Sequence, residues 1–197
     1  MNSNSYLETL KIEDGEIFNL EYHQKRYESV LNSLGISTYK NLSEFITPPD
    51  LNLYRCRLVY TVDTIEVSYH KYVKRDINHL KIIYDDEIEY SVKSTNRDEI
   101  NALYAKRGRY DEILIVKNSL ITDTSIANIA LFRDEVWYTP KSPLLKGTTR
   151  ARLLNEGKIM EKDIHLDEIG SFTEVALLNA MIDFDIIAQE NIGELFC

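Results

Sequence analysis

The run from Leu120 to Arg150 limits the possible folds of this 197-residue chain more than any other segment. It predicts two strands that lead into a glycine turn at Gly147, and a helix that begins at Thr148 or Thr149. The first N–H groups of such a helix have no partner within it and lie at the positive end of its dipole, so they attract phosphate. Taken alone, the motif fits a helix that is merely capped by threonine better than it fits a phosphate site.

The composition indicates a globular protein with one large domain or two small ones. The chain has 44% apolar residues, seven Gly and four Pro, which excludes the disordered and fibrous classes. We expect a cytoplasmic protein without a membrane partner, because no apolar run reaches the roughly 20 residues that span a bilayer. The two cysteines, Cys56 and Cys197, predict neither a disulfide framework nor a metal site.

The net charge of −9 disfavours nucleic acid as a partner, but a few local arginines are enough to bind a small anionic molecule. Arg26 borders the buried face of a predicted helix, where it either pairs with a carboxylate, the simpler interpretation, or holds a buried anion. Arg55 and Arg57 share one face of a predicted strand. They either bind a substrate carboxylate or remain solvated.

The remaining pattern predicts short strands with a few helices among them. A hairpin is expected around Asp14-Gly15, followed by a helix that is capped by Asn19 and ends at Gly35. Strands are expected at Tyr54 to Val62, Ile65 to Val73, His79 to Tyr84, Ile88 to Val92, Asp111 to Val116 and Val175 to Leu178. Further helical segments are expected at Leu42 to Ile46, Thr95 to Gly108 and His165 to Phe172, with an extended segment from Lys158 to Asp163.

Lys93 occupies an unusual place for a lysine, between the strand predicted up to Val92 and a helix whose start matches a capping box at Thr95 and Asp98. There its ammonium group would lie near the positive end of the helix dipole. Cationic surroundings and desolvation lower the pKa of an amine and suit it to form a Schiff base. The alternative is a lysine that extends into solvent.

The order of these segments resembles the class IV aminotransferase family, the pyridoxal-phosphate enzymes of fold type IV, over nearly the whole chain. The likeness depends on a His-x-x-Arg in the first helix, a Schiff-base lysine followed by Asn, a Thr-Glu-x-x-x-x-Asn segment and a Gly-x-Thr-Arg helix start. Each motif is weak by itself, but four in the right order are a strong signal. In this chain they are His23-Gln24-Lys25-Arg26, Lys93-Ser94-Thr95-Asn96, Thr122 to Asn128, and Gly147-Thr148-Thr149-Arg150.

The resemblance assigns roles to these residues. Lys93 would hold pyridoxal 5'-phosphate and move protons, and Arg26 with Thr148 and Thr149 would bind the cofactor phosphate. Asp123, which stands where the family usually has Glu, would pair with the pyridine nitrogen. The remaining candidates are Asn128 for the cofactor, and Arg55, Arg57, Arg97 and Asn179 for the substrate.

The resemblance implies an α+β fold with the two-lobed architecture of D-amino acid aminotransferases. A small N-terminal α/β lobe, residues 1–88, would precede a larger cofactor-binding lobe, residues 89–197, in a homodimer. The segment from Leu177 to Met181 is similar to the Asn-Ala stretch of 4-amino-4-deoxychorismate lyases, which favours that activity. The alternatives are an aminotransferase acting on branched-chain or D-amino acids, and a non-catalytic protein that binds the cofactor or a partner.

Overall fold

The computed structural model describes residues 5–189 and 192–196, which form two compact units. The first unit contains the residues up to Lys74 together with Val92–Asn96, and the second contains Arg75–Ser91 and the residues from Arg97 onward. The chain therefore passes from the second unit back to the first for five residues, whereas the resemblance predicted a single division between residues 88 and 89. Within the described ranges, no helix is both long and apolar enough to cross a membrane.

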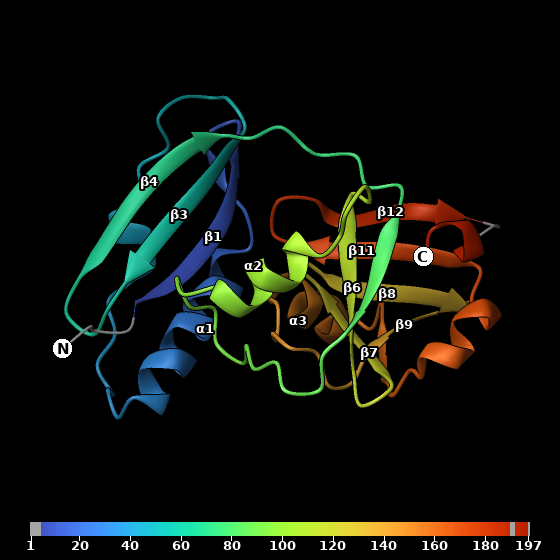
Figure 1. Cartoon of the computed structure of the whole chain (residues 1–197). Helices are drawn as coiled ribbons and strands as arrows, with labels where there is room; N and C mark the ends of the chain where they lie inside the picture. Colours follow the sequence, from blue (N-terminus) through green and yellow to red (C-terminus); the bar gives the residue numbers. More distant parts are fainter. Residues whose placement is uncertain (1–4, 190–191, 197) are drawn as a thin grey trace. The chain divides into compact units, whose positions relative to one another are not determined.

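The first unit is an antiparallel sheet with the strand order β2-β1-β3-β4 (Figure 1). One face of the sheet packs against α1 around buried Leu10, Tyr27, Leu31 and Leu58. The elements are β1 (Tyr6–Glu13), β2 (Glu16–Ile17), α1 (Leu20–Ser33), the 3-10 helix η1 (Leu42–Phe45), β3 (Tyr54–Tyr60) and β4 (Ile65–Lys71).

The turn chemistry of the first unit is largely as predicted. Asp14 and Gly15 both have positive φ, 53° and 79°, which is the conformation that joins β1 to β2 in a tight hairpin. The helix α1 begins after Asn19 and ends before Gly35, which also has positive φ. One detail is wrong: Asn19 lies in the left-handed region, and its side chain makes no capping hydrogen bond among the described residues.

The second unit is built on an eight-stranded sheet in which six strands follow the order β10-β9-β8-β7-β6-β5, and β11 pairs with β8 and β12 (Figure 1). Its strands are β5 (Leu80–Tyr84), β6 (Glu112–Lys117), β7 (Leu120–Thr124), β8 (Asn128–Arg133), β9 (Val136–Pro140), β10 (Met160–Lys162), β11 (Glu174–Asn179) and β12 (Asp183–Gln189). Its helices are α2 (Asp98–Ala105), α3 (Thr148–Asn155), and the 3-10 helices η2 (Leu166–Ser171) and η3 (Ile192–Glu194). Together the units form the mixed α+β fold that was expected.

Both faces of the central strands of this sheet are buried. On β8, Ile129 packs with Leu114 and Leu177 in one core, whereas its neighbour Ala130 packs with Leu153 of α3 in another. Such strands appear in the sequence as nearly continuous apolar runs, which is why β6 and β8 are easy to predict.

Two predictions near Lys93 are wrong. The segment from Ile88 to Val92, all of it described, forms no strand, because a turn at Asp85 precedes it and the chain changes units between Ser91 and Val92. The helix α2 begins at Asp98 after Arg97, without the capping box expected from Thr95. A further strand, β12, was not predicted; it pairs with β11 across a bulge.

Candidate functional site

The His-x-x-Arg motif of α1 converges on one buried carboxylate in the first unit. Glu8 of β1 is 0% exposed, and its Oε2 lies 2.6 Å from Nδ1 of His23. Arg26 donates from Nε and Nη2 to the two oxygens of Glu8, at 2.8 and 2.6 Å. Burial alone would raise the pKa of Glu8, but the charge of Arg26 and the hydrogen bonds of His23 and Arg26 outweigh it and lower this pKa to about 2.

This arrangement shows Arg26 paired with a carboxylate, which was the simpler of the two interpretations of its position. Two donors of its guanidinium group contact Glu8, so the plane of the group is fixed. Its role as a phosphate ligand stays a prediction. Glu8 was not among the residues predicted from the sequence, although a signal existed: Glu8 alternates with Tyr6, Leu10 and Ile12 on the apolar face of β1.

Lys93 belongs to the first unit, where it lies in an irregular segment. Its carbonyl oxygen accepts a 2.8 Å hydrogen bond from the backbone N–H of Leu7, and Val92 beside it packs against the core of the unit. Burial lowers the pKa of His23, and the positive charges of Arg26 and Lys93 lower it further, against the opposing effect of Glu8. Lys93 is therefore close enough to the Glu8 cluster for its charge to act there.

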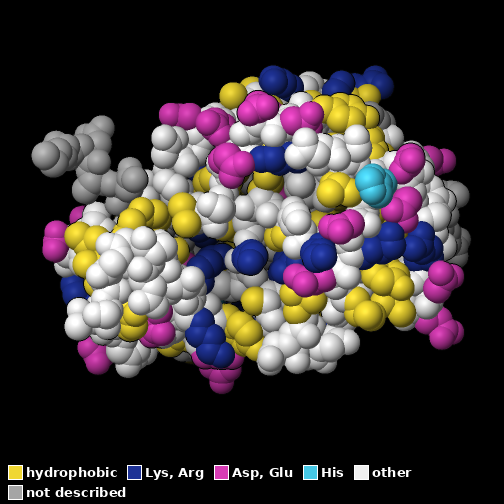
Figure 2. Space-filling view, turned by 90° about the horizontal axis from the view of Figure 1, so that it is seen from below, with side chains coloured by type: hydrophobic (Ala, Val, Ile, Leu, Met, Phe, Trp, Pro, Cys, Tyr) yellow, Lys and Arg dark blue, Asp and Glu magenta, His cyan; other side chains and the backbone are white. Residues whose placement is uncertain are grey.

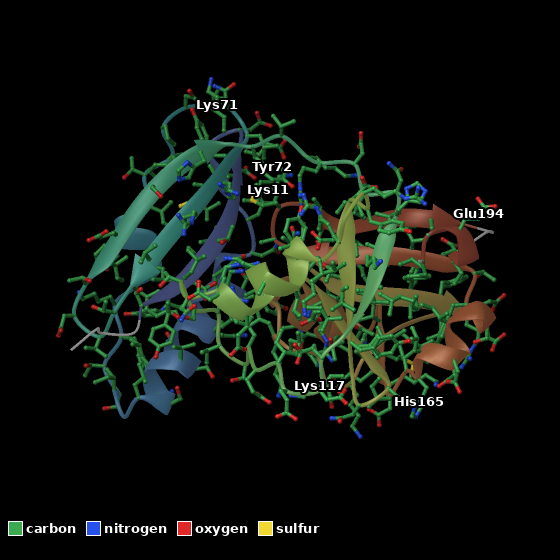
Figure 3. All side chains as sticks on the ribbon, viewed as in Figure 1. Lys11, Lys71, Tyr72, Lys117, His165 and Glu194 are labelled. Atoms are coloured by element: carbon green, nitrogen blue, oxygen red, sulfur yellow. The ribbon has the colours of Figure 1, made fainter. Side chains whose placement is uncertain are left out.

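Basic side chains at the surface of the second unit are commonly paired. Lys117 lies 2.6 Å from Glu89, and Lys162 lies 2.7 Å from Glu168. Figure 2 shows acidic side chains beside basic ones on the face that it draws, and Figure 3 labels Lys117 at the outer edge of the second unit. Such exposed pairs neutralise one another and leave little attraction for an added anion.

Arg55 and Arg57 differ from these pairs. They lie on the face of the first unit's sheet that is opposite to its core, and the strand register places Arg55 between Lys11 and His70. Figure 3 labels Lys11 on this sheet. Within the described part of the chain, neither arginine forms an ion pair. This face therefore presents two guanidinium groups that are not held in ion pairs by described residues, which suits an anionic ligand.

Asp123 is a buried carboxyl group of the second unit, with 4% of its surface exposed. It lies directly opposite Asn128 across β7 and β8. Asn128 donates to its Oδ1 at 2.7 Å, and the backbone N–H of Leu145 donates to its Oδ2 at 2.8 Å. Burial raises the pKa of Asp123 to about 7, although these two hydrogen bonds oppose the shift.

A bulge in β7 turns Asp123 toward Asn128. Val116 pairs with Ile121 and Leu114 pairs with Thr124, so three steps along β7 correspond to two along β6. Ile121 packs in the core with Ile129, which points away from the side of Asn128. Without the extra residue, Asp123 would share the face of Ile121. Bulges of this kind often redirect a side chain at a functional site.

Gly147 joins the Asp123 pair to the start of α3. A Cβ atom at Gly147 would lie 2.1 Å from Oδ1 of Asn128, so this position admits no side chain while Asn128 keeps its place. The helix begins at Thr148 as predicted, and Thr148 and Thr149 are both buried. Because Gly147 has no side chain to cap the first N–H groups, the start of α3 suits an anion.

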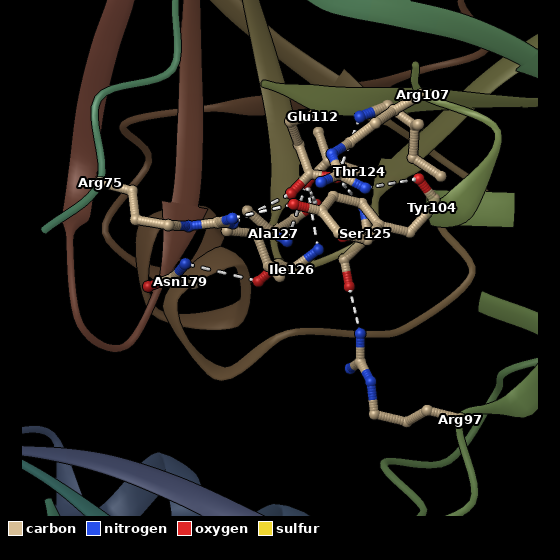
Figure 4. A network of polar contacts seen from close by, with 11 residues as sticks. Arg75, Arg97, Tyr104, Arg107, Glu112, Thr124, Ser125, Ile126, Ala127 and Asn179 are labelled. Atoms are coloured by element: carbon tan, nitrogen blue, oxygen red, sulfur yellow. Dashed lines mark hydrogen bonds and ion pairs between the residues drawn. The ribbon is translucent and has the colours of Figure 1, made fainter. Parts of the chain in front are cut away.

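The two other candidates of the second unit contact the turn between Asp123 and Asn128. Arg97 donates from Nη2 to the carbonyl oxygen of Ser125 at 2.7 Å, and Asn179 donates to that of Ile126 at 3.4 Å (Figure 4). These are bonds that support the turn. A role for Arg97 or Asn179 in binding a substrate stays a prediction.

Each unit thus contains some of the predicted site residues. The first unit brings Lys93 and Arg26 to the cluster around Glu8, whereas Arg55 and Arg57 lie on the other face of the sheet. In the second unit, Asp123, Asn128 and the start of α3 are linked through Gly147.

Comparison with known proteins shows which protein family the chain is similar to. A family model described as class IV amino-transferase matches residues 5–188. A Haemophilus influenzae protein, named only as uncharacterized, is 42% identical over 180 residues, which are 88% of this chain and 96% of that protein. A solved structure from Haemophilus somnus, named as a candidate 4-amino-4-deoxychorismate lyase, is 32% identical with a TM-score of 0.85, covering 92% of this chain and 98% of that one. The Escherichia coli branched-chain amino acid aminotransferase shares the fold, with a TM-score of 0.72 at 15% identity, covering 100% of this chain and 80% of that one.

Proposed function

Because the chain belongs to the class IV aminotransferase family, which consists of pyridoxal-phosphate enzymes, we propose that it is a 4-amino-4-deoxychorismate lyase that uses this cofactor. The reaction would release 4-aminobenzoate and pyruvate. The observation that carries the proposal is the buried carboxyl of Asp123, joined through Asn128 and Gly147 to the start of α3. The likeness to the Haemophilus somnus protein supports the lyase over other activities of the family.

Each unit has residues with the chemistry that pyridoxal 5'-phosphate requires. The start of α3 at Thr148 and Thr149, together with Arg26, would bind the phosphate, and Lys93 would supply the amine that meets the aldehyde. Asp123 would accept a hydrogen bond from the protonated ring nitrogen. When bound, the cofactor supplies a ring that accepts the electrons released as a bond to the substrate carbon breaks.

The chain's own groups would control the protons of the reaction. Asp123 faces neutral donors, so a cationic N–H beside it would favour its ionised form and keep the proton on that nitrogen. The amine of Lys93 would take and return the proton at the reacting carbon. Aspartate is one methylene shorter than the usual glutamate, and the hydrogen bonds of Asn128 and Leu145 fix its carboxyl group in place.

Arg55 and Arg57 would bind the carboxylates of the substrate. The substrate of the lyase carries two carboxylates, and two guanidinium groups without an ion pair in the described part of the chain match that charge. An aminotransferase acting on branched-chain or D-amino acids is the second candidate, favoured by the fold shared with the Escherichia coli enzyme.

Purified protein mixed with 4-amino-4-deoxychorismate and no amino acceptor tests the proposal. We expect 4-aminobenzoate and pyruvate to form in equal amounts. Amino transfer from a branched-chain or D-amino acid to a 2-oxo acid, without release of 4-aminobenzoate, would replace the lyase by the aminotransferase. A protein that binds pyridoxal phosphate equally well after Lys93→Ala and catalyses neither reaction would be a non-catalytic member of the family.

We also propose that the protein is a cytoplasmic homodimer, as the resemblance implies. Sedimentation equilibrium of the purified chain measures the mass, and a mass equal to that of a single chain would contradict the dimer.

A further inference from the structure

A glutamate occupies a fully buried position in the second unit. Glu112 begins β6, is 0% exposed, and is followed by Ile113, Leu114, Ile115 and Val116, which are all 0% exposed. A carboxylate in such a strand is unfavourable unless it is paired and hydrogen-bonded, and an apolar residue would often be more stable there. Packing in the core therefore does not explain why a glutamate occupies this position.

The contacts of Glu112 supply that reason (Figure 4). Its Oε1 accepts hydrogen bonds from the backbone N–H groups of Ile113, at 2.9 Å, and Ser125, at 3.3 Å. Its Oε2 accepts one from Nη2 of Arg75 at 3.3 Å, and Nη1 of Arg75 donates to the hydroxyl of Tyr104 at 3.0 Å. The carboxylate thus joins the turn after β7 to Arg75, the residue at which the chain enters the second unit.

The turn that Glu112 contacts, Thr124 to Ala127, separates Asp123 from Asn128. The register of β7 with β8 consists of the pair Asp123 and Asn128, and next to it the N–H of Thr124 donates to the carbonyl oxygen of Ala127 at 2.9 Å. So short a ladder does little by itself to fix the alignment of the pair. The turn is closed by the hydroxyl of Thr124, which accepts from the N–H of Ala127 at 3.0 Å. Arg97 and Asn179 donate to its carbonyl groups, whereas Glu112 accepts from one of its N–H groups.

We infer that Glu112 is a positioning residue that holds the turn from Thr124 to Ala127 and thereby sets Asp123 against Asn128. The contact between Glu112 and the turn exists in the protein without any cofactor. Its consequence for the cofactor rests on the proposed function, because Asp123 matters there only if it meets the ring nitrogen. Loss of the acceptor at Glu112 leaves the N–H of Ser125 buried without a partner, and the turn then opens more often.

Two variants separate this role from simple core packing. Glu112→Leu fills the space but removes both acceptors, whereas Glu112→Gln keeps one carbonyl oxygen for the N–H groups of Ser125 and Ile113. Amide hydrogen exchange of the protein without cofactor is measured first. In Glu112→Leu we expect the amide of Ser125 to exchange about tenfold faster, while Ile129 and Leu131 in β8 keep their rates. Glu112→Gln should recover most of the protection.

Titration with pyridoxal phosphate, followed by absorbance, gives the second measurement. Glu112→Leu should weaken binding about tenfold, and Glu112→Gln should recover most of it. Unchanged exchange of Ser125, equal acceleration of Ser125 and Ile129, or a glutamine variant as impaired as the leucine variant would each overturn the positioning role. If the wild-type protein binds no cofactor, the proposed function fails, and hydrogen exchange alone decides the role of Glu112 in the turn.

Discussion

The buried carboxyl groups of Glu8 in the first unit and Asp123 in the second have opposite kinds of partner. Glu8 contacts the guanidinium group of Arg26 and the ring of His23, and its pKa is lowered to about 2. Asp123 contacts the amide of Asn128 and a backbone N–H, and burial raises its pKa to about 7. Both groups have hydrogen bonds to their oxygens. They differ in whether a donor in direct contact carries a positive charge.

The difference shows which of the two carboxyl groups has its negative charge balanced by a residue of the chain itself. Glu8 has a cationic partner in contact, so its charge is compensated and it serves to fix Arg26. For Asp123, the charge of Arg150 lowers the pKa only in part, and the neutral donors do not offset burial. A cationic N–H group from outside the chain would stabilise the ionised carboxylate of Asp123. The ring nitrogen of the proposed cofactor would be such a group.

The largest expected effect comes from removing the charge of Asp123. Asp123→Asn keeps the size of the side chain but cannot keep a proton on the ring nitrogen, so release of 4-aminobenzoate should fall about a thousandfold. Asp123→Glu, which restores the residue usual in the family, is the matched control and should lose far less. If the rate of the asparagine variant stays within about tenfold of the wild-type rate, the charge of Asp123 does not serve the reaction, and the contrast with Glu8 is wrong.

Glu8→Gln should act on stability. The variant removes the buried negative charge that faces Arg26, which should lower the free energy of unfolding by about 3 kcal/mol. Glu13→Gln on the same strand is the control, because Glu13 pairs with Lys11 where both are partly exposed, and its loss should change stability by less than about 1 kcal/mol. Urea unfolding at neutral pH measures both. Equal free energies of unfolding for the two variants would show that the buried ion pair between Arg26 and Glu8 contributes no more to stability than an exposed pair.

The two groups should also respond to pH with opposite signs. The pKa of Asp123 is raised from 3.8 to about 7 on folding, so the folded state binds more protons and stability falls as pH rises through this window. Between about pH 5 and about pH 8, the wild type should lose about 2 to 3 kcal/mol relative to Asp123→Asn. The pKa of Glu8 is lowered from 4.5 to about 2, so its contribution is present above 4.5 and is lost as pH falls through about 2. Parallel urea midpoints for the wild type and Asp123→Asn from pH 5 to 8 would contradict the raised pKa.

The sequence predicted the parts of this comparison that depend on local chemistry. The hairpin at Asp14-Gly15 and the start of α3 after Gly147 follow from backbone preferences of a few residues, and both were confirmed. The segment from Ile88 to Val92 has a strand-like pattern, but its position at a change of unit overrides that pattern. This is why the predicted position of Lys93, at the end of a strand, was wrong. Its assignment through the family resemblance did not use that position.

The sequence did not predict which residues are the electrostatic partners of the buried carboxyl groups. Glu8 and His23 are separated by 15 residues, and Glu112 and Ser125 by 13, so only the folded chain brings each pair together. The bulge that turns Asp123 toward Asn128 also depends on how β7 pairs with β6. Spacing within the motif Thr122 to Asn128 indicated which residues matter, but it did not indicate which face of the sheet they occupy.

The smallest expected effect concerns the geometry around Asp123, and it tests whether neutral donors hold that carboxyl group. Gly147→Ala places a Cβ atom 2.1 Å from Oδ1 of Asn128, while the backbone at Gly147, with φ of −68°, accepts an alanine without strain. Asn128 must therefore move away from Asp123, and stability should fall by about 1 to 2 kcal/mol. In Asn128→Ala the obstacle is absent, so the double variant should be about 1 kcal/mol more stable than the sum of the single effects predicts. Urea unfolding of the four proteins measures this coupling, and strictly additive effects would mean that Gly147 is not required for the bond between Asn128 and Asp123.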